Sequence, residues 1–364
     1  MKSSTGKYFI ALDHIRALAV FIVFTWHFIH VNDGQYAPPP IFPLSLLTEG
    51  HTGVSLFMVL SGYLFAKLLD GKKIIYTQFI WNRFLRLAPL LTIVKFIVGI
   101  QMHFSGDDVS AYIRNIILGI ILPSLPNGGW SITVEFHFYL FLPILLFLAA
   151  KWKKSLLFVL AFAIIVRTLL HQELGQIQVL SYLTFIGRID QFVFGIAAHQ
   201  FGKTVEGKHL QAAGVLFLFT CFYWYFELQG GFFKSSSFPS PSMIWVFMPA
   251  IEGLAYATLI AWYDHSFTHS TGRVSRFIAL IGTYSYSIYL LHFFIVFKMA
   301  NFVNDHIFEL SNIYWAIFFS AICFLLMIPI GYLSYQLVES PFLRFRTNYI
   351  VLPVSASNSA IDVG

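Results

Sequence analysis

Arg16 and His27 are the pair of side chains whose types and spacing are best suited to chemistry. They lie eleven residues apart in one apolar segment. Eleven residues of α-helix make about three turns and a rise of roughly 16 Å, so both side chains lie on one helix face. A cation at one end and an imidazole base farther along suit a ligand with an anionic head and a long thin arm. The alternatives are an imidazole satisfied by a neighbouring hydroxyl or carbonyl, and an arginine neutralised by Asp13 one turn earlier.

Arg83 and Arg86 form a second cationic pair, spaced three residues apart as neighbours on one helix face are. Two guanidinium groups can hold phosphates through bidentate hydrogen bonds. The alternative is plain anchoring of a cytoplasmic loop by positive charge. Together with Arg16 they favour a phosphate-bearing ligand, and an acyl thioester of coenzyme A combines such a head with a long arm.

Trp130 and Glu135 open another apolar segment, where a carboxylate can orient or assist a histidine base. A capping or interfacial carboxylate is the alternative. Ser61 and Tyr63 supply hydroxyl groups to a polar lining around Gly62, although close helix packing explains this triplet equally well. His292 is a second imidazole in apolar sequence, which either binds an acceptor or holds helices together.

These residues belong to a chain that cannot cover itself with a water-facing surface. Of its 364 residues, 57% are hydrophobic and only 11% are charged, whereas a soluble domain is about a quarter charged. At roughly 20 apolar residues per spanning helix, the chain has room for about ten crossings. We therefore expect an all-α, polytopic membrane helical bundle.

Hydropathy predicts ten spanning helices. They lie near residues 15–31, 53–70, 87–104, 135–150, 155–170, 180–201, 210–226, 243–263, 278–300 and 313–336. The segment 113–125 is too short to cross and ends in prolines, which predicts an interfacial or re-entrant piece. We expect one membrane domain over residues 1–346 and a disordered cytoplasmic tail over 347–364.

The positive charges give an independent test of this arrangement, because lysine and arginine accumulate in cytoplasmic loops. With the N-terminus inside, the outer segments hold only Arg114 and Lys234. The inner segments hold Lys2, Lys7, Lys72, Lys73, Arg83, Arg86, Lys151, Lys153, Lys154, Lys203, Lys208, Arg273, Arg276, Arg344 and Arg346. This asymmetry predicts an even number of crossings with both termini cytoplasmic.

Other function classes are disfavoured by the same composition. The net charge of +6 is scattered between apolar segments and forms no basic stripe for nucleic acid. Cys221 and Cys323, the two cysteines, lie inside apolar stretches and supply neither a disulfide framework nor a metal site. Arg188, Asp190 and Glu252 also lie in apolar segments, where we expect an internal ion-pair network without chemistry.

Several motifs together resemble those of the acyltransferase 3 family of integral membrane O-acyltransferases, and the likeness covers nearly the whole chain. Arg16 and His27 resemble its first-helix signature, an arginine or lysine and a histidine with ten residues between them. The further motifs, in order, are Gly53 to Leu64 ending in Ser-Gly-Tyr-Leu, the pair Arg83 and Arg86, Trp130 to Pro143, Ser285 to His292, and Glu339-Ser340-Pro341 with Arg344.

The resemblance implies transfer of an acyl group, usually acetyl, from cytoplasmic acyl-CoA such as acetyl-CoA. The implied acceptor is a hydroxyl of a cell-envelope glycan or glycolipid, such as lipopolysaccharide O-antigen or exopolysaccharide, at the outer face of the bacterial inner membrane. His27 is then the catalytic histidine, Arg16, Arg83 and Arg86 bind the coenzyme, and Glu135 and Trp130 lie in the site, with no metal. Ser61, Tyr63 and His292 are our further candidates for substrate contacts.

Two features depart from the family pattern. Phe136 and His137 replace a second glutamate and a glutamine, which leaves Glu135 as the one carboxylate there. Only eighteen residues follow Arg346, so we expect no appended outer domain and a transfer that finishes in the membrane domain or passes to another protein. A transporter or flippase for an acylated or anionic solute is the alternative function, and a purely structural assembly role is the third.

Overall fold

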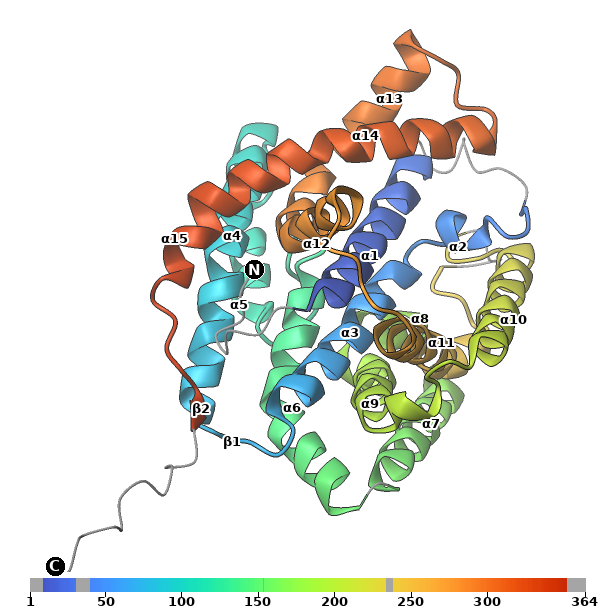
Figure 1. Ribbon diagram of the computed structural model, residues 1–364. Helices are drawn as coiled ribbons and strands as arrows, with labels where there is room; N and C mark the ends of the chain where they lie inside the picture. The colour runs from blue at the N-terminus through green and yellow to red at the C-terminus, as the bar shows by residue number, and fades with distance from the viewer. Residues whose placement is uncertain (1–8, 31–39, 153, 234–237, 352–364) are drawn as a thin grey trace, which may run out of the picture.

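Helices make up most of the chain in the computed structural model, which describes residues 9–30, 40–152, 154–233 and 238–351 (Figure 1). The α-helices are α1 Ile10–Ile29, α2 Ser45–Thr48, α3 Thr52–Leu69, α4 Tyr76–Ser105, α5 Val109–Leu118, α6 Trp130–Lys151, α7 Ser155–Leu174, α8 Gln178–Leu183, α9 Phe185–Phe201, α10 His209–Leu228, α11 Ile244–Ser266, α12 Arg273–Leu291, α13 Val296–His306, α14 Ile313–Ser334 and α15 Ser340–Leu343. The short elements are β1 Lys73–Ile74, the 3₁₀ turns η2 Gly202–Thr204 and η3 His292–Phe294, the π-helical turn η4 Tyr335–Glu339, and β2 Ile350–Val351.

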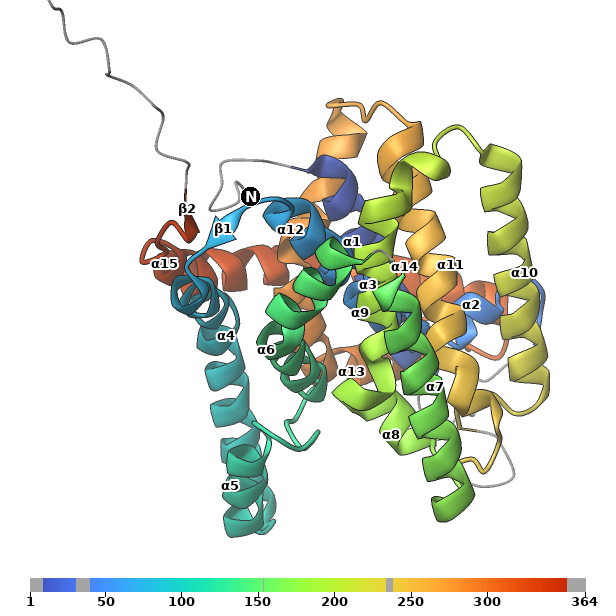
Figure 2. The same cartoon turned by 90° about the horizontal axis from the view of Figure 1, so that it is seen from below.

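Nine of the helices in the described part of the chain are long and apolar enough to cross a membrane. They are α1, α3, α4, α6, α7, α10, α11, α12 with its 3₁₀ extension, and α14 with its continuation. The expectation of an all-α, multi-pass membrane protein is confirmed. α5 has ten residues and packs beside α4 (Figure 2), so the segment predicted to be too short to cross is short in the structure as well.

The sixth predicted span, 180–201, is wrong as a single helix. The chain breaks at Thr184, whose backbone is extended and whose hydroxyl accepts a hydrogen bond from the Gly187 amide at 3.1 Å. Threonine is a favoured N-cap because its side chain satisfies an amide that the new helix leaves free. The result is the short helix α8 followed by the 17-residue helix α9.

The ninth predicted span, 278–300, is wrong at both ends. α12 begins at Arg273 and ends at Leu291, and α13 starts at Val296 as a separate helix. His292 Nδ1 donates to the Tyr289 carbonyl oxygen at 2.5 Å, within a 3₁₀ turn between the two helices. α4 also begins eleven residues before its predicted start at 87, so Arg83 and Arg86 lie inside a long helix.

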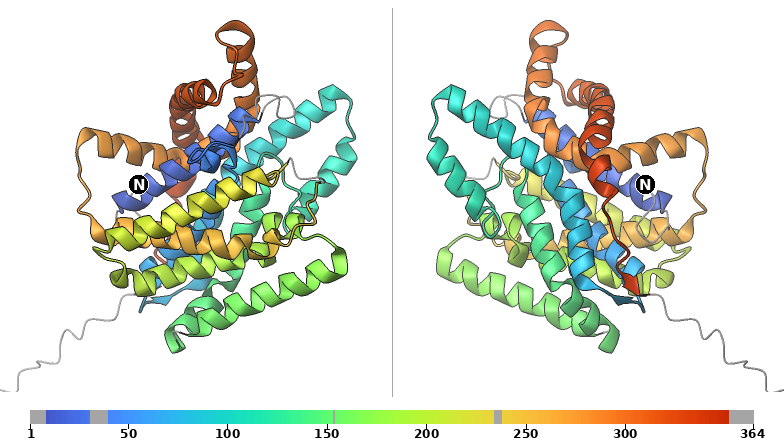
Figure 3. Two further views of the ribbon diagram at one scale, coloured as in Figure 1. Left: turned by 90° about the vertical axis from the view of Figure 1, so that its right-hand side faces the viewer. Right: turned by 90° about the vertical axis from the view of Figure 1, so that its left-hand side faces the viewer.

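The centre of the bundle is formed by α1, α3, α9, α11 and α12, which pack against one another. α3 and α9 approach closely at Gly62 and Gly195, where an added Cβ would meet backbone oxygens of Phe192 and Val59 at 2.2 and 2.1 Å. Small residues of this kind let helix backbones come together in a membrane. α4, α7 and α10 lie at the edges (Figure 3) and leave large apolar side chains exposed, as a lipid-facing surface requires.

Replacing Gly62 with alanine should therefore destabilise the bundle. The added methyl group would collide with the Phe192 carbonyl and force α3 from α9, which costs about 1–3 kcal/mol. We expect a lower thermal midpoint for the detergent-solubilised variant. Gly214→Ala on α10 is the matched control, because an added Cβ there meets nothing within 4 Å. Equal midpoints for the two variants would contradict the packing argument.

A buried ion pair ties three helices together. Arg167 of α7 donates through both terminal nitrogens to the Asp190 carboxylate of α9, at 2.9 and 2.6 Å. Its Nε donates to the Val246 carbonyl of α11 at 2.8 Å. Both charged side chains are fully buried, so the pair fixes the relative position of these helices.

The loops divide between two ends of the bundle. At the first, the His199 imidazole lies 3.3 Å from the Asp70 carboxylate, the Gly207 amide donates to Ser266, and the Ile75 amide donates to the Tyr349 carbonyl. We call this the basic end; it contains Lys72, Lys73, Lys203, Lys208, Arg273 and Arg346. Figure 2 shows β1 and β2 on this side and α5 and α8 on the other, the distal end.

Both ends of the described chain lie at the basic end, which agrees with an even number of crossings, although nine helices of the described residues, not the predicted ten, are long and apolar enough to cross. β2 pairs antiparallel with β1 at the basic end, and His14, near the start of α1, contacts Tyr263 and Ser275 at the same end. The first five residues of the predicted tail, 347–351, are therefore bound to the bundle. The remainder of that tail, 352–364, lies outside the described residues.

Candidate functional site

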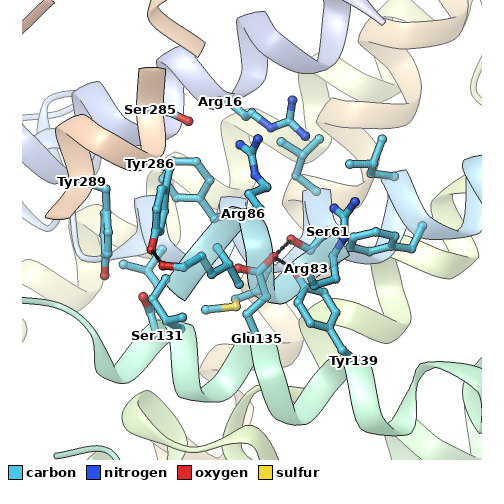
Figure 4. Close-up of a pocket in the computed structure, with 18 residues that line it drawn as sticks. Arg16, Ser61, Arg83, Arg86, Ser131, Glu135, Tyr139, Ser285, Tyr286 and Tyr289 are labelled. Carbon is cyan, nitrogen blue, oxygen red and sulfur yellow. Dashed lines mark hydrogen bonds between the residues drawn. The ribbon is translucent and has the colours of Figure 1, made fainter. Parts of the chain in front are cut away.

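Five helices, α1, α3, α4, α6 and α12, supply the polar residues of a cavity of about 100 Å³ near the basic end (Figure 4). We call it the arginine cavity. Arg16 comes from α1, Ser61 from α3, Arg83 and Arg86 from α4, and Glu135 from α6. The structure thus brings together five residues that the sequence separates by up to 119 positions (16 to 135).

The arginines of this cavity are held in different ways. The Arg16 guanidinium donates to the Asp13 carboxylate one turn away and keeps 23% of its side chain exposed. The Arg83 guanidinium lies over the rings of Phe65 and Phe79, at 5.2 and 5.6 Å from their centres. Cation–π contacts orient a guanidinium without using its N–H donors. Arg83 can therefore donate hydrogen bonds to an anionic ligand.

Glu135 is oriented by two hydroxyl groups. Ser61 and Tyr139 donate to the same carboxylate oxygen of Glu135, at 3.0 and 2.5 Å. Tyr139 lies one turn after Glu135 on α6, and an (i, i+4) pair of this kind shares a helix face. This spacing is the signal in the sequence that would have identified Tyr139, which our sequence analysis missed.

His27 lines a second cavity of about 220 Å³, the histidine cavity. Trp130 also lines it, together with aromatic side chains that include Trp26, Tyr182 and Phe232. Val54 and Tyr289 belong to the walls of both cavities. The two cavities are therefore neighbours that meet at Val54 and Tyr289. On α1, Arg16 lines the arginine cavity and His27 lines the histidine cavity.

Two imidazoles lie side by side at the histidine cavity. The rings of His27 and His292 have their centres 5.1 Å apart, and Phe293 lies 4.5 Å from His27. Because His292 Nδ1 donates to a carbonyl oxygen, its Nε2 is an acceptor in the neutral ring. This buried Nε2 has no hydrogen-bond partner among the described residues.

The remaining candidates are distributed unevenly. Ser61 lines the arginine cavity, whereas Tyr63 lies at the basic end, where its hydroxyl donates to the Asp264 carboxylate beside Lys67. Residues two apart on a helix point about 200° from each other, so Ser61 and Tyr63 cannot serve one site. His292 contacts His27 without lining either cavity.

The expected charge network exists with different partners. Arg188 donates to Ser55 and Gln191 at 3.0 and 2.9 Å, and Gln191 in turn donates to Glu252. Asp190 instead pairs with Arg167, a residue that the sequence analysis did not single out. The Arg188 guanidinium also lies over the Trp130 ring, 5.3 Å from its centre, and so supports a wall of the histidine cavity.

The described residues contain no group of three or more histidine, cysteine, aspartate or glutamate side chains that could hold a metal ion. Cys221 and Cys323 are both free thiols. The polar side chains of the two cavities include guanidinium, carboxylate, hydroxyl, carboxamide and imidazole groups. They suit anion binding and proton transfer.

Comparison with known proteins identifies relatives that are named O-acetyltransferases. Peptidoglycan O-acetyltransferase OatA of Listeria monocytogenes serovar 1/2a (strain ATCC BAA-679 / EGD-e) is 29% identical over 174 residues, which cover 41% of this chain and 26% of that protein. Putative O-acetyltransferases of Staphylococcus aureus strains COL and MSSA476 are each 29% identical over 164 residues, 38% of this chain and 25% of theirs. The chain thus spans about a quarter of the length of the curated relatives it matches. No solved structure matches it.

The model of the acyltransferase domain family matches residues 9–332. This range runs from the start of α1 almost to the end of α14 and includes every residue that lines the two cavities. The chain therefore belongs to the acyltransferase 3 family.

Proposed function

We propose that this enzyme moves an acyl group, acetyl in the simplest case, from coenzyme A to a hydroxyl of a cell-envelope glycan or glycolipid. The observation that carries the proposal is the convergence of three arginines on a cavity that shares walls with the cavity of His27. The name of the Listeria relative, a peptidoglycan O-acetyltransferase, supports a glycan acceptor. In this proposal the basic end faces the cytoplasm of a bacterium and the distal end faces outward from the inner membrane.

The donor enters at the basic end. Arg16, Arg83 and Arg86 bind the phosphates of acyl-CoA through charge-assisted hydrogen bonds, and the pantetheine arm passes Val54 and Tyr289 towards His27. Glu135 lines the cavity of the arginines and not that of His27, so in this proposal it positions the donor instead of assisting the histidine base. Trp130 and its aromatic neighbours form the wall against which the acceptor binds from the distal end.

His27 performs the proton transfers. Its neutral imidazole takes the proton of the acceptor hydroxyl while the hydroxyl oxygen attacks the thioester carbonyl carbon. The carbon–sulfur bond then breaks, and the thiolate of coenzyme A leaves with the proton from His27. The products are the acyl ester and free coenzyme A, so no oxidant, metal or further reactant is needed.

Donor binding is tested by the double variant Arg83→Gln with Arg86→Gln. Each arginine supplies charge-assisted hydrogen bonds worth about 1.5–3 kcal/mol, so their joint loss should raise KM for acetyl-CoA at least about a hundredfold. The acceptor KM should change little, because the acceptor binds elsewhere. Transfer is measured with labelled acetyl-CoA in membranes.

Arg273→Gln is the matched control, since Arg273 is an exposed arginine at the same end of the bundle. It should leave the KM for acetyl-CoA unchanged. A double variant at 83 and 86 that keeps the wild-type KM for the donor would refute the phosphate site. The transporter alternative rests on the buried charges, of which Arg167 and Asp190 form an ion pair while Arg188 and Glu252 are hydrogen-bonded to the side chain of Gln191.

A further inference from the structure

The chain between Arg344 and Val351 folds back onto the start of α4. Ile350–Val351 pairs with Lys73–Ile74, and the Tyr349 carbonyl accepts the Ile75 amide at 2.8 Å. The Tyr349 side chain is buried, with its ring centre 5.5 Å from that of Phe79. This return segment lies beyond residue 332, where the family match ends.

A pair of hydrogen bonds fixes the return segment beside the arginines of α4. The side chain of the buried Asn82 donates to the Thr347 carbonyl at 2.7 Å and accepts the Thr347 amide at 3.0 Å. Asn82 directly precedes Arg83, and Thr347 directly follows Arg346. The two bonds therefore place Arg346 next to the cationic part of α4.

The surroundings of Arg346 are unusually positive. Burial, together with the nearby Arg86 and Arg83 guanidinium groups, lowers the pKa of Arg346 to about 9. The carboxylate of Glu339 is also close, and one of its oxygens accepts the Ser287 hydroxyl. The whole cluster contains four arginines and three carboxylates. The arginines are Arg16, Arg83, Arg86 and Arg346, and the carboxylates are those of Asp13, Glu135 and Glu339.

Two guanidinium nitrogens in this cluster lack acceptors. Nε of Arg83 and Nε of Arg346 are buried and have no hydrogen-bond partner among the described residues. A buried donor without an acceptor costs free energy, and like charges held together cost more. An anionic ligand that accepts from both side chains would remove both costs.

We propose that Arg346 is a further guanidinium of the donor's phosphate site and binds the nucleotide end of coenzyme A together with Arg83 and Arg86. This inference rests on the proposed function. Arg346 does not line the arginine cavity. In this proposal it therefore contacts the nucleotide of coenzyme A, which stays outside the cavity while the pantetheine arm enters it. That part carries two kinds of phosphate, the 3′-phosphate and the diphosphate.

The test measures binding of coenzyme A to the full-length, detergent-solubilised protein without any acceptor. Arg346→Gln should weaken coenzyme A binding about tenfold, the loss expected for one charge-assisted contact. Its thermal midpoint without ligand should stay close to wild type, because Nε has no protein acceptor to lose. Arg273→Gln, which removes an exposed arginine at the same end, should bind coenzyme A as wild type does.

3′-Dephospho-coenzyme A separates the two phosphate sources. If Arg346 holds the 3′-phosphate, wild type should prefer coenzyme A over the dephospho form and Arg346→Gln should lose this preference. If Arg346 holds the diphosphate, the substitution should weaken both ligands equally. Either result supports the proposal.

Unchanged coenzyme A affinity in Arg346→Gln would overturn the inference and leave the proposed function standing. Should that variant not fold, Arg346→Lys replaces it in the test. A lysine keeps the charge and loses the two-pronged donor geometry, so wild-type affinity in this variant would also overturn the inference. A wild-type protein that binds no coenzyme A at all would instead count against the proposed function.

Discussion

Replacing His27 with alanine should lower the rate of acyl transfer by about 10²- to 10⁴-fold, the range that a positioned general base contributes. Without the imidazole, the acceptor hydroxyl must lose its proton to water in a cavity walled by Trp26, Trp130 and other aromatic side chains. Coenzyme A should still bind, because the arginines lie in the neighbouring cavity. The measurements are single-turnover transfer of labelled acetyl groups and equilibrium binding of coenzyme A.

His103→Ala is the control for this substitution, since His103 is an exposed histidine near the end of α4. It should transfer acetyl groups at the wild-type rate. If a folded His27→Ala protein kept more than about a tenth of the wild-type rate, His27 would not be the base. Loss of coenzyme A binding in that variant would show instead that His27 belongs to the donor site.

Replacing Arg167 with methionine should unfold or strongly destabilise the protein, although Arg167 lines neither cavity. The substitution leaves the buried Asp190 carboxylate without its partner, and breaking a buried ion pair in this way costs about 3–5 kcal/mol. We expect little folded protein in membranes and a large fall in thermal midpoint. Fluorescence-detected gel filtration and thermal unfolding in detergent measure both.

The double variant Arg167→Met with Asp190→Asn tests whether the unpaired Asp190 carboxylate causes this loss of stability. Removing both charges avoids the unpaired carboxylate, so part of the lost stability should return. An Arg167→Met protein as stable as wild type would show that the ion pair does not hold α7, α9 and α11 together. So would a double variant whose loss of stability, measured from wild type, equals the sum of the losses in the two single variants.

Hydropathy predicts most of the fold because spanning a membrane demands long apolar helices. It does not predict the breaks at Thr184 and after Leu291, where apolar composition continues across the boundary. Those breaks depend on a side-chain cap and on a histidine that binds a backbone carbonyl. Such local hydrogen bonds leave almost no trace in a window average.

The candidate site, too, could be predicted from the sequence only in part. Helical periodicity relates Arg16 to His27 and Arg83 to Arg86, since each pair lies on one helix. Helical periodicity does not predict contacts between helices that are far apart in the sequence. The pairing of Arg167 with Asp190, and the position of Arg346 beside α4, depend on how the bundle closes. Periodicity does explain why Tyr63 faces away from Ser61.

The most direct test of acyl transfer from the cytoplasm supplies labelled acetyl-CoA to one face of sealed membrane vesicles and follows the label into glycan or glycolipid. If the arginines bind the donor from the cytoplasm, transfer occurs when the donor reaches the cytoplasmic face, as in inverted vesicles, and does not occur when the donor is confined to the opposite face. Transfer only from the opposite face, or no transfer from either face with folded protein and acceptor present, would contradict acyl transfer from the cytoplasm.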